Sequence, residues 1–154
     1  MTADSDSPPR TAVWCIVHAN RIGFQVIDGK VCLPSGALPI INEETLLYRR
    51  DISLAHDGSA VLLAVHDQAE APDFLTFASL RQLVGRLDKP SWMLASRALQ
   101  VLSWQKSNQF CGQCGAQMIE NSTELQRKCP ACGYFCYPQI APAVIMAVHD
   151  TNRI

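Results

Sequence analysis

Apolar and polar residues alternate over short segments in the first half of the chain, a pattern typical of β-strands separated by turns. Residues 13–17 and 24–27 are predicted strands. The hairpin signal Asp28-Gly29 separates the second strand from another at 31–33. This part of the chain is therefore expected to be β-rich.

The same kind of pattern continues toward the middle of the chain. Residues 33–39 hold two prolines and a glycine and are predicted to form a loop. The apolar segments 46–54 and 60–65 flank Asp57-Gly58, which predicts a second hairpin. Residues 74–77 are a candidate for one more short strand.

The hydrophobic period becomes helical after residue 78. Ser79 and Gln82 have the spacing of a capping box. A short helix is predicted there from four apolar residues at helical spacing, Leu80, Leu83, Val84 and Leu87. Lys89-Pro90 interrupts the chain, and Ser91 is expected to cap a longer helix that ends near Gln105. Its predicted buried stripe consists of Trp92, Ala95, Leu99 and Leu102.

Two Cys-x-x-Cys pairs, Cys111/Cys114 and Cys129/Cys132, follow this helix and are separated by fourteen residues. Four thiolates in this arrangement are the ligand set of a structural zinc ion. A glycine follows each pair and tolerates the positive φ that a turn around a metal requires. The alternative is two redox dithiols, or thiols with no role. A four-sulfur zinc has no open coordination position, so the site is expected to fold a zinc ribbon over 108–137 rather than activate water.

An apolar run at 143–148 follows the ribbon and predicts a β-strand that is apolar on both faces, as in the interior of a larger sheet. Residues 149–152 are a predicted turn, and 153–154 resemble the beginning of a returning strand. A central strand without its partner would expose a sheet edge. The sequence therefore leads us to expect a truncated domain at this end.

Composition adds limits on the class of protein. The chain has 154 residues, a hydrophobic content of 48%, a mean hydropathy of +0.04 and a net charge of −1. The near-neutral charge gives no general case for nucleic-acid binding, and neither a spanning apolar run nor a signal peptide is recognised. Seven cysteines fit a reducing cytoplasm. Cys15 and Cys32 are expected to be buried core thiols, and Cys136 lies close enough to the pairs to compete as a ligand.

The motifs also resemble a known family. The order Phe-Cys-x-x-Cys-Gly, fourteen residues, Cys-x-x-Cys and then Tyr-Pro-Gln-Ile-Ala-Pro at 137–142 is similar to the NADH pyrophosphatase family of Nudix hydrolases. The residues Leu33-Pro34, Gly36, Leu38-Pro39 and Ser79-Leu80-Arg81 resemble the amino-terminal domain of that family more weakly. The resemblance covers nearly all of the chain from about residue 12.

This resemblance implies an enzyme that splits NADH or NAD into NMNH or NMN and AMP, and some family members also remove NAD caps from RNA. It also implies a homodimer. The cysteine content leads us to expect a cytoplasmic protein, and the composition gives no case for membrane contact. Family catalysis uses the Nudix box G-x5-E-x7-R-E-U-x-E-E-x-G-U, whose glutamates hold Mg²⁺ or Mn²⁺. That box does not occur in the 154 residues. The chain alone is therefore expected to be inactive, with catalytic residues beyond Ile154.

The implied fold is α+β and has five parts. They are a disordered lead at 1–11, a β-rich, Nudix-like amino-terminal domain at 12–90, a connecting helix at 91–107, the zinc ribbon at 108–137 and the first strand of a truncated Nudix domain at 138–154.

Three residues match family positions that contact substrate. Arg81 matches an arginine suited to phosphate pairing or base stacking; from the residues alone it is a solvated arginine near a helix start. Glu124 matches a family glutamate and is otherwise an exposed carboxylate. Tyr137 matches a tyrosine at the ribbon–Nudix junction and is otherwise a packed aromatic. Ser35 departs from the family, which can place a lysine there, so a phosphate contact from that loop is lost.

Two other hypotheses about the function of the chain remain. A stand-alone zinc-ribbon module could bind nucleic acid or protein, with Lys106, Arg127 and Lys128 nearby, although Glu120 and Glu124 oppose a basic surface. A purely structural oligomerisation fragment is the third.

Overall fold

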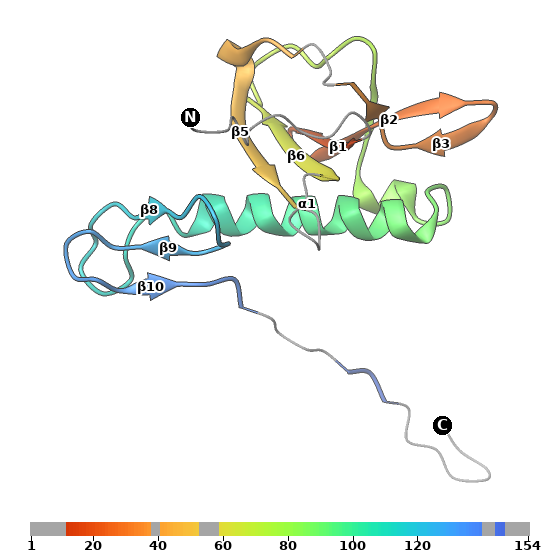
Figure 1. The fold of residues 1–154 in the computed structure, drawn as a ribbon. Helices are drawn as coiled ribbons and strands as arrows, with labels where there is room; N and C mark the ends of the chain where they lie inside the picture. Colours follow the sequence, from red (N-terminus) through yellow and green to blue (C-terminus); the bar gives the residue numbers. More distant parts are fainter. Residues whose placement is uncertain (1–11, 38–40, 53–58, 140–143, 147–154) are drawn as a thin grey trace, which may run out of the picture. The chain divides into compact units, whose positions relative to one another are not determined.

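The computed structural model describes residues 12–37, 41–52, 59–139 and 144–146. The chain divides into two compact units, Met1–Gln105 and Lys106–Ile154. Figure 1 shows a β-rich amino-terminal unit with one long helix, and a smaller unit of short strands. The predicted α+β class is therefore confirmed. Within the described residues, no helix combines the length and the apolar character needed to cross a membrane.

A seven-stranded mixed sheet forms the centre of the amino-terminal unit. Its main path has the order β3-β2-β1-β6-β5, while β4 pairs with β1 and β7 pairs with β2. The strands β1 and β6 are parallel to each other, and the other pairs are antiparallel. The strand bounds are Ala12–His18 (β1), Arg21–Ile27 (β2), Lys30–Cys32 (β3), Ser35–Gly36 (β4), Leu46–Asp51 (β5), Ala60–Val65 (β6) and Thr76–Ala78 (β7).

Tight two-residue turns join the first three strands. Asp28 and Gly29 connect β2 to β3 with φ values of 50° and 76°, as the sequence predicted. Ala19 and Asn20 connect β1 to β2 with φ values of 47° and 59°. Positive φ at both central residues matches the right-handed twist of the flanking strands. The turn predicted at Asp57-Gly58 lies outside the described residues, although β5 and β6 pair antiparallel as expected.

The two parallel strands supply the main core of this unit. Every residue of β6 is buried, which is typical of a central strand covered on both faces. Alternate residues of the two strands form one cluster, Ala12, Trp14, Ile16, Val61, Leu63 and Val65. Cys15 is buried in β1 as predicted, and burial raises the pKa of its thiol to about 12. Cys32 is only half-buried, contrary to the prediction, because it lies in the short outer strand β3.

Two short 3-10 helices also belong to this unit, η1 at Glu43–Thr45 and η2 at Leu80–Leu83. The predicted capping box between Ser79 and Gln82 is present in η2. The predicted continuation of the helix to Leu87 is wrong. Val84 has extended backbone and Gly85 has φ 73°, so the helix ends after a single turn.

The long helix α1 spans Lys89–Ser107. It begins two residues before the predicted start, because Asp88 and not Ser91 provides the cap: Asp88 Oδ1 accepts a hydrogen bond from the Ser91 amide at 2.8 Å. Pro90 fits in the first turn, where its missing N–H costs nothing. Near the other end, Gln105 Nε2 donates to the Tyr48 hydroxyl of β5 at 2.7 Å. Figure 1 shows α1 running along the sheet.

The buried face of α1 differs in part from the prediction. Trp92 and Leu99 are only half-buried, whereas Ala95 and Leu102 are buried as expected. The buried face is therefore centred on small and aliphatic residues and not on Trp92, which sequence periodicity alone did not reveal. The buried residues are Ala95, Ala98, Val101, Leu102 and Gln105.

The strand predicted at 143–148 is not formed over its described part, 144–146. The side chains of Val144, Ile145 and Met146 have exposed fractions of 81%, 102% and 80%. A β-strand needs a hydrogen-bonded neighbour, and no described residue pairs with this segment.

Candidate metal centre

The ribbon is built on a small antiparallel sheet with the order β10-β9-β8. Its strands are Ile119–Glu120 (β8), Arg127–Lys128 (β9) and Phe135–Cys136 (β10). The strands β8 and β9 form an antiparallel hairpin, and β9 pairs on its other side with β10, which was not predicted. A two-residue strand gives little hydrophobic pattern, so only the pairing with β9 reveals it.

The two Cys-x-x-Cys pairs lie in two separate loops that have the same backbone hydrogen-bond pattern. The Cys111 amide donates to the Ala116 carbonyl and the Cys129 amide to the Tyr134 carbonyl, both at 2.8 Å. In each loop the glycine amide then donates back to the first cysteine, from Gly115 at 2.9 Å and from Gly133 at 3.0 Å. Two segments far apart in sequence therefore form equivalent loops. We call these loops, residues 111–116 and 129–134, the two knuckles.

The two glycines make this geometry possible. Gly115 has φ 74° and Gly133 has φ 77°. These values lie in the left-handed region, where a side chain costs about 1–2 kcal/mol. Glycine after each pair is thus explained by the backbone of the knuckle.

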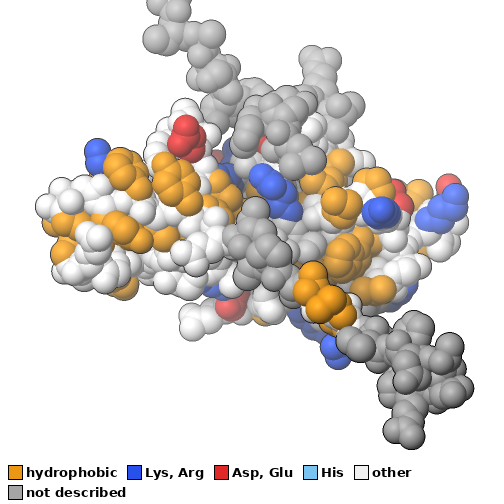
Figure 2. All heavy atoms as spheres, turned by 90° about the horizontal axis from the view of Figure 1, so that it is seen from below, with side chains coloured by type: hydrophobic (Ala, Val, Ile, Leu, Met, Phe, Trp, Pro, Cys, Tyr) orange, Lys and Arg blue, Asp and Glu red, His pale blue; other side chains and the backbone are white. Residues whose placement is uncertain are grey.

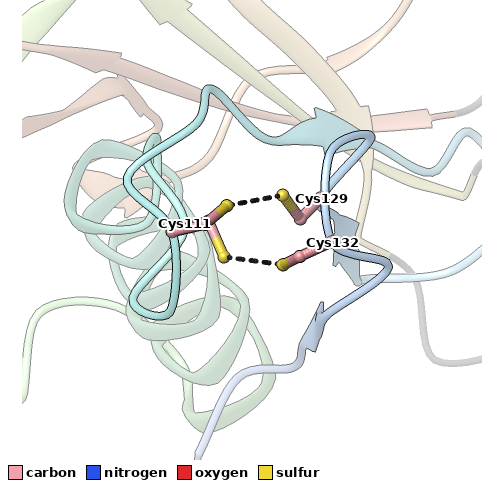
Figure 3. A group of neighbouring side chains, drawn as sticks. Cys111, Cys129 and Cys132 are labelled. Atoms are coloured by element: carbon pink, nitrogen blue, oxygen red, sulfur yellow. Dashed lines mark hydrogen bonds between the residues drawn. The ribbon is translucent and has the colours of Figure 1, made fainter.

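The four cysteine sulfurs of the knuckles converge on one point. Cys111 Sγ lies 3.6 Å from Cys132 Sγ, and Cys114 Sγ lies 3.4 Å from Cys129 Sγ. All four ligand atoms lie within 4.8 Å of one another. Figure 3 shows the sulfurs of Cys111, Cys129 and Cys132 pointing toward one another between the knuckles.

These distances fit a tetrahedral zinc ion. With Zn–S bonds of about 2.3 Å, the sulfurs of a regular tetrahedron lie about 3.8 Å apart. The observed separations are far longer than a disulfide bond of about 2.0 Å, and all seven cysteines are free. Convergence of both pairs on one point favours a metal site over two separate redox dithiols. A four-Cys cluster in a zinc ribbon supports structural zinc.

Hydrogen bonds and burial shift the thiol pKa values of the cluster in opposite directions. The Cys132 backbone N–H, together with other donors around it, lowers the pKa of Cys129 to about 6 against the opposing effect of burial. Against the lowering effect of the Tyr134 backbone, burial and the neighbouring sulfurs raise the pKa of Cys132 to about 12. Zinc binds thiolate and not thiol, so metal binding would release the protons that remain on the cluster.

The remaining thiol of the ribbon, Cys136, lies beside the cluster and not within it. It packs against the buried residues Cys111, Met118 and Cys129. Its Sγ contacts Asn108 Oδ1 at 3.2 Å. The converging group contains the four knuckle cysteines without Cys136.

The three predicted substrate residues lie on exposed surface in two different units. Arg81 lies in η2 of the amino-terminal unit, and Glu124 and Tyr137 lie in the ribbon unit. Asn121 Oδ1 accepts hydrogen bonds from the amides of Thr123 and Glu124 at 2.8 Å and 3.2 Å, which orders the loop that carries Glu124. Tyr137 follows β10 with an exposed fraction of 52%.

The ribbon also has an exposed row that sequence reasoning missed. Ile119, Lys128 and Phe135 face one another across the three strands, and all three are exposed. The Lys128 ammonium lies 5.3 Å from the Phe135 ring centroid. Figure 2 shows hydrophobic side chains gathered on the surface of the ribbon, at the left of the view. Only the strand register brings these residues together.

Comparison with known proteins gives two findings. The family model for the NADH pyrophosphatase zinc ribbon domain matches residues 106–137. Proteins named NAD-capped RNA hydrolase NudC match beyond the ribbon. The Deinococcus radiodurans protein is 36% identical over 126 residues, covering 81% of this chain and 44% of the relative.

Two other relatives with the same name extend the match. The Stutzerimonas stutzeri protein is 31% identical over 147 residues, and the Shigella dysenteriae protein is 37% identical over 144 residues. Each alignment covers 92% of this chain and 50% of the relative. The chain thus spans about half the length of the curated relatives it matches.

Proposed function

We propose, from the premise that this chain is related along most of its length to the NADH pyrophosphatase family, that it is the amino-terminal and zinc-ribbon portion of an NAD(H) pyrophosphatase. The reaction would be hydrolysis of the diphosphate of NADH or NAD, giving NMNH or NMN and AMP. NAD-capped RNA is the second proposed substrate, because the relatives bear that name.

The observation that carries this proposal is the extent of the similarity. The ribbon match covers 106–137, but the alignment with the Stutzerimonas stutzeri relative covers 147 residues. A chain that shared only a widespread metal-binding module with these relatives would match them in the ribbon alone. The match across both units supports the proposal that this chain shares the domain arrangement of the relatives.

We propose a division of labour between the parts of the protein. The four-cysteine site has no open coordination position, so its zinc holds the ribbon together and does not act on substrate. Residues 138–154 would begin a Nudix domain whose glutamates bind Mg²⁺ or Mn²⁺ and position the attacking water. The 154 residues contain no Nudix box, so we expect no hydrolysis from them alone.

Three exposed residues are proposed to contact the dinucleotide. Arg81 offers a planar guanidinium for a phosphate or a base. Glu124 offers a carboxylate on an ordered loop, and Tyr137 offers an exposed ring and hydroxyl just after the ribbon. Their exposure is compatible with a role in binding.

A homodimer and a cytoplasmic location complete the proposal. Seven free cysteines suit a reducing compartment. The dimer follows from the relationship to the family.

The intact mass of the native gene product tests the proposal. A mass well above 17.0 kDa, the mass of these residues, would support a following catalytic domain. A mass of about 17.0 kDa would contradict it and would favour a stand-alone zinc-ribbon module.

Kinetics of the longer protein test the contact assigned to Arg81. Loss of a charge-assisted hydrogen bond should lower kcat/KM for NADH roughly ten- to hundredfold in Arg81→Ala. Arg49→Ala is the matched control, because Arg49 is an exposed arginine on β5 of the same unit. Unchanged kinetics in Arg81→Ala with normal zinc content would remove Arg81 from the site.

A further inference from the structure

The four knuckle cysteines differ in exposure in a regular way. The first cysteine of each pair is buried, with exposed fractions of 4% for Cys111 and 0% for Cys129. The second cysteine of each pair, Cys114 or Cys132, is exposed. Each knuckle therefore turns one sulfur toward the interior of the ribbon and one toward solvent.

The sulfur distances connect these two classes across the knuckles. Exposed Cys114 lies 3.4 Å from buried Cys129, and exposed Cys132 lies 3.6 Å from buried Cys111. Each solvent-facing sulfur thus has a protected sulfur of the opposite knuckle beside it. This pairing of an accessible sulfur with a nearby second sulfur is the arrangement that a reversible thiol oxidation requires.

We propose that Cys114 and Cys132 are oxidation sites at which a hydroperoxide such as hydrogen peroxide expels the zinc by joining the two knuckles through disulfides. The proposal rests on the zinc site and is independent of the proposed hydrolytic activity. It assigns the exposed cysteines a role in addition to metal binding.

The chemistry proceeds in two balanced steps. The Cys114 thiolate attacks one peroxide oxygen, an S–O bond forms, the O–O bond breaks, and hydroxide leaves. The Cys129 thiolate then attacks the sulfur of the sulfenic acid, an S–S bond forms, and a second hydroxide leaves. The two sulfurs lose two electrons in total, the peroxide gains them, and solvent protons convert both hydroxides to water. The same steps join Cys132 to Cys111.

Release of the metal follows from the loss of donors. A disulfide sulfur is no longer an anionic thiolate, so each disulfide removes two of the four zinc ligands. Because zinc binding and folding of such a module are coupled, the ribbon should unfold when the zinc leaves.

The test treats the zinc-loaded chain with hydrogen peroxide at less than one equivalent, in the presence of dimedone to trap sulfenic acids. We expect dimedone on Cys114 and Cys132 in several-fold excess over Cys111 and Cys129. A parallel sample without dimedone should release zinc to a chromophoric chelator in step with disulfide formation. Label predominantly on the buried pair, or zinc retained after peroxide treatment, would overturn the proposal.

Peptide mapping and matched variants sharpen the test without altering a zinc ligand. The expected disulfides are Cys114–Cys129 and Cys111–Cys132, which join the sulfurs 3.4 Å and 3.6 Å apart. Disulfides found within each Cys-x-x-Cys pair would overturn the proposal that oxidation joins the two knuckles. Cys136→Ser and Cys32→Ser remove the two half-buried thiols outside the cluster and should leave zinc release unchanged. Loss of peroxide-induced release in Cys136→Ser would place the oxidation at Cys136 and overturn the assignment.

Discussion

The two units of this chain are stabilised by different means. The amino-terminal unit has a seven-stranded sheet whose central strands are buried, and a helix that lies along it. The ribbon has strands of two residues, and in the part of it that the structure describes the buried hydrophobic cluster consists of Cys111, Met118 and Cys129. A large apolar core can hold one unit, whereas the ribbon needs the bonds of a metal ion. Similar backbone pairing in the two units therefore has very different sources of stability.

Removal of zinc should have the largest effect and should separate the two units. A structural zinc contributes about 10–16 kcal/mol to such a module at neutral pH, so a chelator should unfold the ribbon. Hydrogen exchange should show loss of protection in β8, β9 and β10, with β1 and β6 unchanged. Cys129→Ser should give the same result, whereas Cys136→Ser should keep its zinc. A ribbon that stays protected without metal would contradict the comparison.

Shortening a side chain of the apolar core should destabilise the amino-terminal unit and leave the ribbon unaffected. Trp14 of β1 is buried in the core cluster that β1 and β6 share, and Trp14→Ala should lower the free energy of unfolding of the amino-terminal unit by about 3–5 kcal/mol. Leu47→Ala is the control, because Leu47 has an exposed fraction of 42% on β5. Denaturant unfolding measures the change, and metal analysis should find normal zinc. Equal losses in both variants would mean that Trp14 is not a core residue.

The knuckle backbone offers a smaller test within the ribbon. Gly115→Ala places a side chain at φ 74° and should cost about 1–2 kcal/mol, which lowers zinc affinity roughly five- to thirtyfold. Gly112→Ala is matched, because Gly112 lies in the same knuckle with open space around it and without positive φ. Competition with a chelator of known affinity would compare them. Equal affinities would show that the knuckle does not require glycine at 115.

The helix cap should give the smallest effect. Asp88→Ala removes the acceptor for the Ser91 amide and should cost about 1 kcal/mol in the amino-terminal unit. Hydrogen bonds from Ser91, first through its side chain and then through its amide, lower the pKa of Asp88 below its ordinary value of 3.8. The charged cap therefore stabilises the folded unit above pH 3.8, and this contribution is lost as pH falls through the lower folded-state pKa.

Asp88→Asn separates the hydrogen bond from the charge. Asparagine also caps helices well, so thermal unfolding at neutral pH should be close to that of the wild type. The loss of stability at low pH that comes from protonation of Asp88 should disappear. A loss at neutral pH as large as in Asp88→Ala would contradict the role of Asp88 as the cap.

Local patterns in the sequence predicted many of the elements. Strand segments, the turn at Asp28-Gly29 and the capping box at Ser79 depend on neighbouring residues, and all three appear in the structure. The spacing of the two Cys-x-x-Cys pairs predicted a four-cysteine cluster, because each knuckle is a local structure with its own glycine. The contacts proposed for Arg81, Glu124 and Tyr137 remain predictions.

Other features could be established only from the folded structure. Extension of the helix to Leu87 was wrong, and the strand predicted at 143–148 is not formed over its described part, 144–146. Local apolar pattern does not tell whether a segment finds a partner. Ser91 was a plausible cap by residue type, but Asp88 is the residue whose carboxylate reaches the free amide.

Neighbouring residues are enough to predict the short-range structure of this protein, namely its hairpins, its capping box and the two metal-binding knuckles. The parallel pairing of β1 with β6 depends on the folded chain, as does the burial of Cys111 and Cys129 while Cys114 and Cys132 face solvent. Turns and caps are set by the conformational preferences of a few adjacent residues. Pairing and burial depend on surfaces that meet from distant parts of the chain, and periodicity along the chain does not identify those partners.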